Sequence, residues 1–150
     1  MMDLVIIFAA KYLYLLTILM FLVIVFVTTQ RKKMIVLSLV AFPLALAVAK
    51  VLNLFIKNPR PFVVEHMKPL IDHAADNGFP SDHTLLTMTI AAIVFVYHRK
   101  LGIALAFCAL VVGWARVMAK VHHPIDIVGS IIIAIVAVFL AKGILQLFKR

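Results

Sequence analysis

The stretch that decides the fold covers residues 4–29 and reads LVIIFAAKYLYLLTILMFLVIVFVTT. Its only charged residue is Lys11. A membrane-spanning helix needs roughly 20 mostly apolar residues, and this run is longer than that. The residues before it lack the basic segment of a signal peptide, and no convincing cleavage site follows. We therefore expect this run to be a permanent membrane span.

Four further apolar stretches follow the first one. They cover approximately residues 34–56, 85–97, 101–118 and 127–148. Of the 150 residues, 65% are hydrophobic and 14% are charged, whereas a soluble domain is about half apolar and about a quarter charged. The sequence therefore predicts an all-α integral membrane protein. We expect a bundle of about five transmembrane helices that forms one domain over residues 1–150.

Two of these stretches have features that modify a simple span. The stretch at 85–97 is too short to cross a bilayer as a straight helix, so we expect its start to lie inside the membrane boundary or among other helices. The stretch at 34–56 contains Pro43, which is expected to kink the helix.

The basic residues indicate the orientation of the chain. The net charge is +9, and much of it comes from short clusters beside the apolar runs: Arg31-Lys32-Lys33, Arg99-Lys100 and Lys149-Arg150. Cytoplasmic loops carry such clusters, so we predict a multi-pass protein of the cell membrane with its N-terminus outside and its C-terminus in the cytoplasm. The connections at 57–82 and 119–124 then lie outside, as do all six acidic residues. Because no single patch combines basic and aromatic residues, we expect no nucleic-acid partner.

The outer connections and the helix ends beside them contain groups suited to holding phosphate. The guanidinium groups of Arg60 and Arg116 each offer a planar fork of donors that matches phosphate oxygens. Ser81 precedes the stretch at 85–97 at a plausible helix N-cap, where its hydroxyl and the free N–H groups favour an anion. Phosphoryl transfer requires such groups, because the migrating group carries negative charge.

A nucleophile and an acid can also be assigned from the residues. His122 and Asp126 are four apart, so in a helical turn the carboxylate can bond one ring nitrogen and leave the other free to attack phosphorus. Pro124 is compatible with a helix that starts there. His83 can protonate the leaving oxygen. The alternative is a zinc site of His122, His123 and Asp126, which the nearby arginines disfavour because they would repel a cation.

Three segments, in this order, resemble the signature motifs of the type 2 phosphatidic acid phosphatase (PAP2) superfamily: Arg60-Pro61, Pro80-Ser81-Asp82-His83 and Arg116-x5-His122-x3-Asp126. The resemblance covers roughly residues 50–130 and is greatest to bacterial undecaprenyl pyrophosphate phosphatases. It implies that His122 is the nucleophile, that Asp126 supports it and that His83 is the general acid. It also implies that the arginines and the serine hold the phosphate.

The chain departs from the family pattern at three positions. The first motif usually has a lysine seven residues before its arginine, where this chain has Asn53. Lys50 and Lys57 lie about one helical turn to either side and are candidates for its role. Asp82 replaces the usual glycine of the second motif, and Ala115 replaces the serine before the third-motif arginine. We count Lys50, Lys57 and Asp82 among the predicted phosphate-binding residues.

Together, the residues and the resemblance predict hydrolysis of undecaprenyl pyrophosphate through a phosphohistidine, without a metal or cofactor. A broader phosphatidate or phosphatidylglycerophosphate phosphatase and a lipid phosphotransferase are alternatives that use the same chemistry. A small transporter is the alternative from another class, since intramembrane charges such as Lys50 and Arg116 also mark transport pathways. A transporter should carry its charges near mid-membrane on several helices, whereas here they cluster towards one edge.

Overall fold

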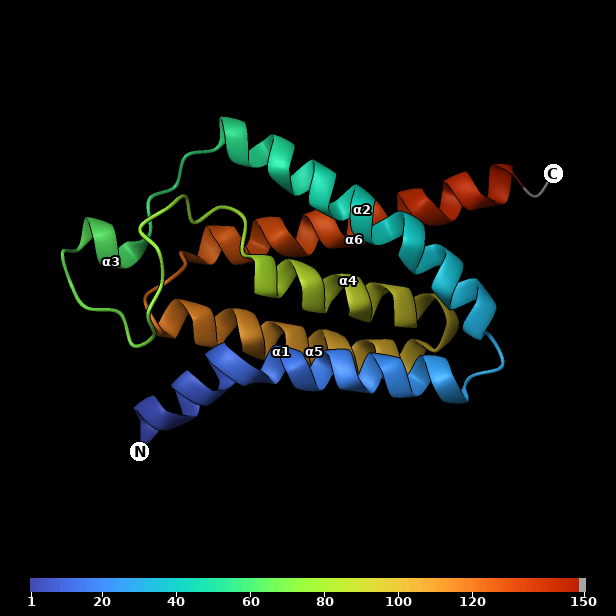
Figure 1. Cartoon of the computed structure of the whole chain (residues 1–150), viewed down its shortest axis with the longest axis horizontal. Helices are drawn as coiled ribbons and strands as arrows, with labels where there is room; N and C mark the ends of the chain where they lie inside the picture. The colour runs from blue at the N-terminus through green and yellow to red at the C-terminus, as the bar shows by residue number, and fades with distance from the viewer. Residues whose placement is uncertain (149–150) are drawn as a thin grey trace.

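The computed structural model describes residues 1–148 and shows long helices that run side by side (Figure 1). The elements are α1 (Met2–Val27), α2 (Arg31–Phe55), α3 (Pro61–Val64), α4 (Asp82–Tyr97), α5 (Arg99–Met118) and α6 (Pro124–Leu147). No strand forms within the described residues, where one isolated bridge pairs Pro59 with Asn77. The predicted all-α bundle is confirmed. The basic cluster Lys149-Arg150 lies outside the described residues.

Four helices are long and apolar enough to cross a membrane, namely α1, α2, α5 and α6. Their outer surfaces remain apolar: only five of the 26 residues of α1 are buried against the rest of the chain. Such surfaces are stable when lipid covers them. Helix α2 continues through Pro43 as one helix.

Helix α4 is the shortest of the long helices and lies at the centre of the bundle. Its 16 residues extend only about 24 Å. Ten of those residues are buried, and α4 packs against α1, α2, α5 and α6. Because neighbouring helices, and not lipid, cover most of its surface, α4 does not have to match the thickness of the bilayer. This explains the short apolar stretch that the sequence places among other helices.

The two ends of the bundle carry different segments (Figure 1). The N-terminus, the connection from α2 to α4 and the connection from α5 to α6 lie at one end, which we call the motif end. The turns from α1 to α2 and from α4 to α5 lie at the opposite end with the last residues of α6. We call this the basic end, because it carries Arg31, Lys32, Lys33, Arg99, Lys100 and Lys142.

The long connection from α2 to α4 folds back onto the connection from α5 to α6. The backbone N–H of Phe62 donates to Lys120 O at 3.2 Å, and that of Leu70 donates to Ala119 O at 3.2 Å. The side chain of Ile71 is 3% exposed and packs in an apolar cluster with residues of α1 and α5. These contacts bring the first and third sequence motifs together.

Candidate active site

His122 and Asp126 meet where α6 begins. Pro124 occupies the first turn of α6, in agreement with the sequence, and His123 is the N-cap residue. The Asp126 carboxylate accepts a hydrogen bond from the backbone N–H of His123 at 2.8 Å, which caps the helix. The same carboxylate oxygen lies 3.3 Å from Nδ1 of His122. The carboxylate therefore caps the helix and orients the histidine.

The hydrogen-bond partners of His122 define its tautomer. Nδ1 lies 2.9 Å from the carbonyl oxygen of Gly78 and close to the Asp126 carboxylate, and both partners are acceptors. Nδ1 therefore carries the hydrogen. Nε2 lies 3.2 Å from Nη1 of Arg60, which can only donate, so Nε2 carries the lone pair. A histidine nucleophile requires this arrangement.

The environment of His122 also favours the neutral ring. The side chain is 2% exposed. Burial lowers the pKa of His122 below its usual value, and the charges of Arg116 and Arg60 lower it further, against the opposing hydrogen bond to Asp126. At neutral pH the imidazole therefore keeps the lone pair on Nε2.

Arg60 is held rigidly beside His122. Its Nε donates to the Asp76 carboxylate at 2.8 Å, and its Nη1 donates to Val121 O at 2.7 Å. Burial acts to raise the pKa of Asp76, but the hydrogen bond and the charge of Arg60 outweigh it and lower that pKa. The guanidinium is 5% exposed and is fixed by groups from two connections.

Arg116, near the end of α5, has hydrogen-bonding capacity that the described residues do not fill. Its side chain is 3% exposed, and Nη1 donates to Ala10 O at 3.4 Å. Nε and Nη2 are buried without a partner within residues 1–148. A buried donor without a partner costs about 1–3 kcal/mol, and more when it is charged. These donors are therefore a strong indication of an anionic ligand at this place.

Ser81 occupies the predicted N-cap position of α4, but its hydroxyl does not cap the helix. The hydroxyl instead accepts a hydrogen bond from Thr84 Oγ1 at 3.2 Å. The backbone N–H of Ser81 donates to Asp126 O at 3.4 Å, and its carbonyl accepts from Ser130 Oγ at 2.9 Å. These bonds fix the start of α4 against the first turns of α6.

His83 lies in the first turn of α4, as predicted. Its ring packs edge-to-face against Tyr14 of α1, with ring centroids 4.6 Å apart. Asp82, one residue earlier, is exposed. No sequence motif points to Tyr14, because α1 contains none of the three motifs.

The structure distinguishes the two candidate lysines. Lys57 donates from Nζ to the carbonyl of Asn53 at 3.0 Å, so it bonds back to α2. Lys50 lines a groove of about 560 Å³ together with Arg60 and Asp82. This placement favours Lys50 over Lys57 as a phosphate-binding residue.

All three asparagines of the chain support this site, and sequence reasoning assigned none of them a role in it. Asn58 Nδ2 donates to the second Asp126 oxygen at 2.7 Å, and its backbone N–H donates to Asn77 Oδ1 at 2.8 Å. Asn77 Nδ2 donates to Ile56 O at 2.8 Å, and Asn53 Nδ2 donates to Phe79 O at 2.5 Å. An amide side chain both donates and accepts, so it can join two backbone segments. The three asparagines lie close in sequence to the first two motifs, and this clustering could have indicated their supporting role.

Gly78 is required for the close approach of these segments. A Cβ there would lie 3.0 Å from Asn58 O and 3.0 Å from Asp126 Oδ2. The backbone N–H of Gly78 also donates to Asn58 O at 2.9 Å. A side chain at this position would therefore push against the groups that orient His122.

Two further histidines lie near the site. The ring of His73 is 6.1 Å from that of His122, and burial, followed by the charges of Arg60 and Arg116, lowers the pKa of His73. His123 Nε2 lies 3.1 Å from Pro59 O. Within residues 1–148, no group of three histidine, cysteine or acidic side chains lies close enough together to hold a metal ion.

The site thus places a buried histidine–carboxylate pair near two arginines on an all-helical scaffold with membrane-length helices, an arrangement suited to binding an oxyanion. A family model described as the PAP2 superfamily matches residues 33–150. The chain therefore belongs to the PAP2 superfamily, as the sequence motifs predicted.

Individual proteins show how similar the chain is to known members. It is 35% identical over 115 residues to undecaprenyl-diphosphatase BcrC of Bacillus subtilis (strain 168), which covers 77% of this chain and 60% of that protein. It is 32% identical over 111 residues to the bacitracin transport permease protein BcrC of Bacillus licheniformis, covering 73% of this chain and 55% of that one. The chain thus spans little more than half the length of these relatives.

The fold is also similar to a solved structure. The crystal structure of Aquifex aeolicus LpxE superposes with a TM-score of 0.75 at 24% identity, covering 93% of this chain and 86% of that chain. At this identity the likeness concerns the fold alone.

Proposed function

We propose that the chain is a membrane lipid phosphatase that hydrolyses undecaprenyl pyrophosphate to undecaprenyl phosphate and inorganic phosphate. The observation that carries this proposal is the buried Nε2 lone pair of His122, held between Asp126 and Arg60 near the unfilled donors of Arg116. The name of the Bacillus subtilis relative supports the choice of substrate.

In the first step, Nε2 of His122 attacks the terminal phosphorus of the pyrophosphate. The bond from this phosphorus to the bridging oxygen breaks, and its electrons go to that oxygen, which takes a proton from His83. Undecaprenyl phosphate leaves, and the phosphoryl group remains on Nε2. The ring becomes cationic, and Asp126 stabilises it through Nδ1–H.

In the second step, water attacks the phosphohistidine. His83, now neutral, accepts a proton from the water, and the bond between nitrogen and phosphorus breaks with its electrons returning to Nε2. Inorganic phosphate leaves, and His122 regains its lone pair. His83 is protonated again, so the site is ready for another substrate.

The chain's own cations stabilise the charge of the transferring group. Arg60 and Arg116 bind the equatorial oxygens, and the first turn of α4 at Ser81 offers backbone donors. Lys50 lines the adjoining groove and binds the second phosphate. A mechanism of this kind works without a metal ion.

The motif end faces outward in this proposal, with the C-terminus in the cytoplasm, because lysine and arginine gather at the other end. The groove beside Lys50 is also lined by Leu46 and Leu54, which are exposed on α2. The headgroup can therefore reach the cations from the lipid side while the polyprenyl tail stays in the bilayer.

The test is phosphate release by the purified protein in detergent. Undecaprenyl pyrophosphate, phosphatidate and phosphatidylglycerophosphate are compared at matched surface concentration, with and without EDTA or vanadate. We expect preference for the pyrophosphate, inhibition by vanadate, which mimics five-coordinate phosphorus, and no effect of EDTA. Preference for phosphatidate would contradict the substrate, and loss in EDTA that a divalent ion restores would contradict the metal-free mechanism. No release from any lipid would favour the transporter alternative.

A further inference from the structure

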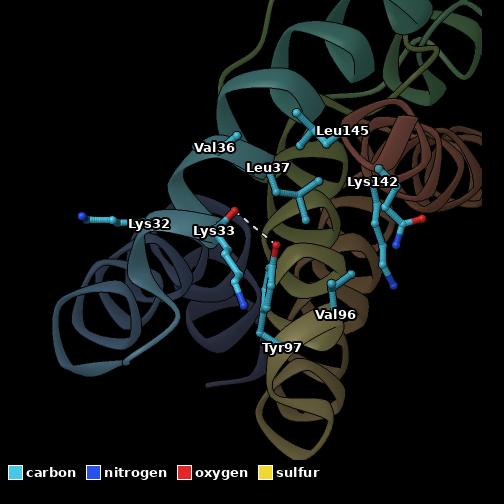
Figure 2. Close-up of a pocket in the computed structure, with 9 residues that line it drawn as sticks. Lys32, Lys33, Val36, Leu37, Val96, Tyr97, Lys142 and Leu145 are labelled. Atoms are coloured by element: carbon cyan, nitrogen blue, oxygen red, sulfur yellow. Dashed lines mark hydrogen bonds between the residues drawn. The ribbon is translucent and has the colours of Figure 1, made fainter. Parts of the chain in front are cut away.

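The basic end contains a pocket that the proposed phosphatase chemistry does not use. It has a volume of about 390 Å³ and lies where α2, α4 and α6 meet (Figure 2). Lys32 and Lys33 of α2 and Lys142 of α6 contribute three cations to its lining. Lys33 lies beside Tyr97 and Lys142 lies on the other side of Val96, whereas the Lys32 side chain extends outward (Figure 2).

Within residues 1–148, these cations have no acidic partner at their end of the bundle. Among the described residues, the ion pairs are Arg60–Asp76 and Lys120–Glu65, and both lie at the motif end, as does the contact of Asp126 with the neutral His122. The six acidic residues of the sequence are Asp3, Glu65, Asp72, Asp76, Asp82 and Asp126. All six belong to segments of the motif end. The pocket lysines are therefore left for an anion from outside the described chain.

The wall of the pocket is apolar. Leu37 is 1% exposed and packs in the core, and Val96 adds a second aliphatic surface. The Tyr97 hydroxyl donates to the backbone carbonyl of Lys33 at 3.2 Å, which joins the end of α4 to the first turn of α2. The pocket therefore combines cations with an aliphatic wall, and the Tyr97 hydrogen bond holds two of its helices together.

We propose that this pocket binds the headgroup of an anionic phospholipid from the leaflet at the basic end. Lys33 and Lys142 bind the phosphate, and the aliphatic wall contacts the first carbons of the acyl chains. The pocket lies at the ends of the membrane-length helices α2 and α6, which is the level of the lipid headgroups. Free inorganic phosphate would leave the aliphatic wall unused, so the occupant is a lipid.

The test compares two charge-matched variants of the full chain in detergent. Lys33→Gln with Lys142→Gln removes two cations from the pocket. Arg31→Gln with Lys100→Gln removes two cations from the same end but outside the pocket. Phosphatidylglycerol is titrated, with phosphatidylcholine as the neutral reference, and bound lipid is measured by native mass spectrometry.

We expect the pocket variant to bind phosphatidylglycerol roughly thirtyfold more weakly, and the control variant only a few-fold more weakly. Lys33→Arg with Lys142→Arg should restore binding, because charge is kept. Inorganic phosphate should not compete at lipid-equivalent concentration. Equal weakening by both glutamine variants would show a general surface potential and overturn the proposal, as would competition by inorganic phosphate. Circular dichroism checks that each variant is folded.

Discussion

The two ends of this bundle treat charge in opposite ways. At the motif end, cations and carboxylates are in contact: Arg60 pairs with Asp76 and Lys120 with Glu65, and the neutral His122 is hydrogen-bonded to Asp126. Asparagine side chains also tie the connections together there. At the basic end, the described charges are all positive and none forms an ion pair. The charges of the motif end are therefore held in place by other groups of the chain, whereas those of the basic end are available to groups outside it.

This difference in charge pairing indicates which kind of ligand each end can bind. Buried polar groups are normally satisfied, and at the motif end the exceptions are two donors of Arg116. Because only these two donors lack a hydrogen-bond partner among the described buried side chains of this end, they indicate a site for one bound anion. The basic end has exposed or half-buried lysines around an apolar wall, which suits a lipid surface better than a reaction.

The largest expected effect is a loss of turnover on substitution at the motif end that substitution at the basic end does not cause. His122→Ala should lower turnover by on the order of 10⁴-fold or more, because it removes the oriented Nε2 lone pair that attacks phosphorus in the proposed mechanism. The pocket variant Lys33→Gln with Lys142→Gln should keep turnover within a few-fold of the unmodified chain. The measurement is kcat for phosphate release.

His66→Asn is the matched control for the loss at His122, since His66 is an exposed histidine at the same end of the bundle, in the connection from α2 to α4. Asparagine tolerates the φ of 51° found there. Comparable turnover in His122→Ala and His66→Asn would remove the distinction between the ends.

The next effect concerns the orientation of the nucleophile. Asp126→Asn keeps a side chain that can cap α6 but loses the charge that stabilises the His122 tautomer. We expect kcat to fall by roughly 10²–10⁴-fold while the fold is retained. Steady-state kinetics and circular dichroism check both parts, and an unfolded variant would show that the carboxylate is needed for structure first.

A smaller effect is expected from the support of that carboxylate. Asn58→Ala removes the 2.7 Å hydrogen bond to the second oxygen of Asp126. Removing such an outer partner typically costs about 10–100-fold in activity. Gln146→Ala, a polar truncation at the basic end, is the control and should be silent. Equal kcat values for the two variants would mean that Asn58 does not position Asp126.

The smallest effect is a shift in pH dependence. Because the pKa of His122 is lowered, the neutral nucleophile persists below pH 6.5, and the acid limb of kcat/KM should lie below that value. In Asp126→Asn, the hydrogen bond that raises this pKa is weakened, so the acid limb should move to still lower pH. A limb above pH 6.5 in the unmodified chain would show that the protonation of His122 does not control the rate.

Much of the motif end could be predicted from sequence, since residues such as His83, His122 and Asp126 lie at fixed spacings near helix starts. The apolar runs likewise predicted the helices, and the shortness of the run at residues 85–97 indicated that its helix starts inside the membrane boundary or among other helices. These features depend on local spacing and on hydrophobicity, which a sequence displays directly.

The supporting residues could not be assigned in this way. Asn58 reaches Asp126 across 68 positions of the chain, and Asp76 reaches Arg60 through a connection that is irregular after the short helix α3. Tyr14 reaches His83 from a helix that otherwise reads as lipid-facing. Ser81 occupies the predicted N-cap position of α4, but its hydroxyl, predicted to face an anion, accepts a hydrogen bond from Thr84 Oγ1. Such contacts depend on how the connections fold over the bundle, which periodicity does not encode.

The central claim is that the motif end performs phosphoryl transfer through His122. The most direct measurement is rapid acid-free quenching of the protein with undecaprenyl pyrophosphate labelled in the terminal phosphate, followed by mass spectrometry of its peptides. We predict an alkali-stable, acid-labile phosphate on the peptide that contains His122, absent from His122→Ala. Turnover by the unmodified chain with label on another residue, or undiminished turnover in His122→Ala, would contradict the claim.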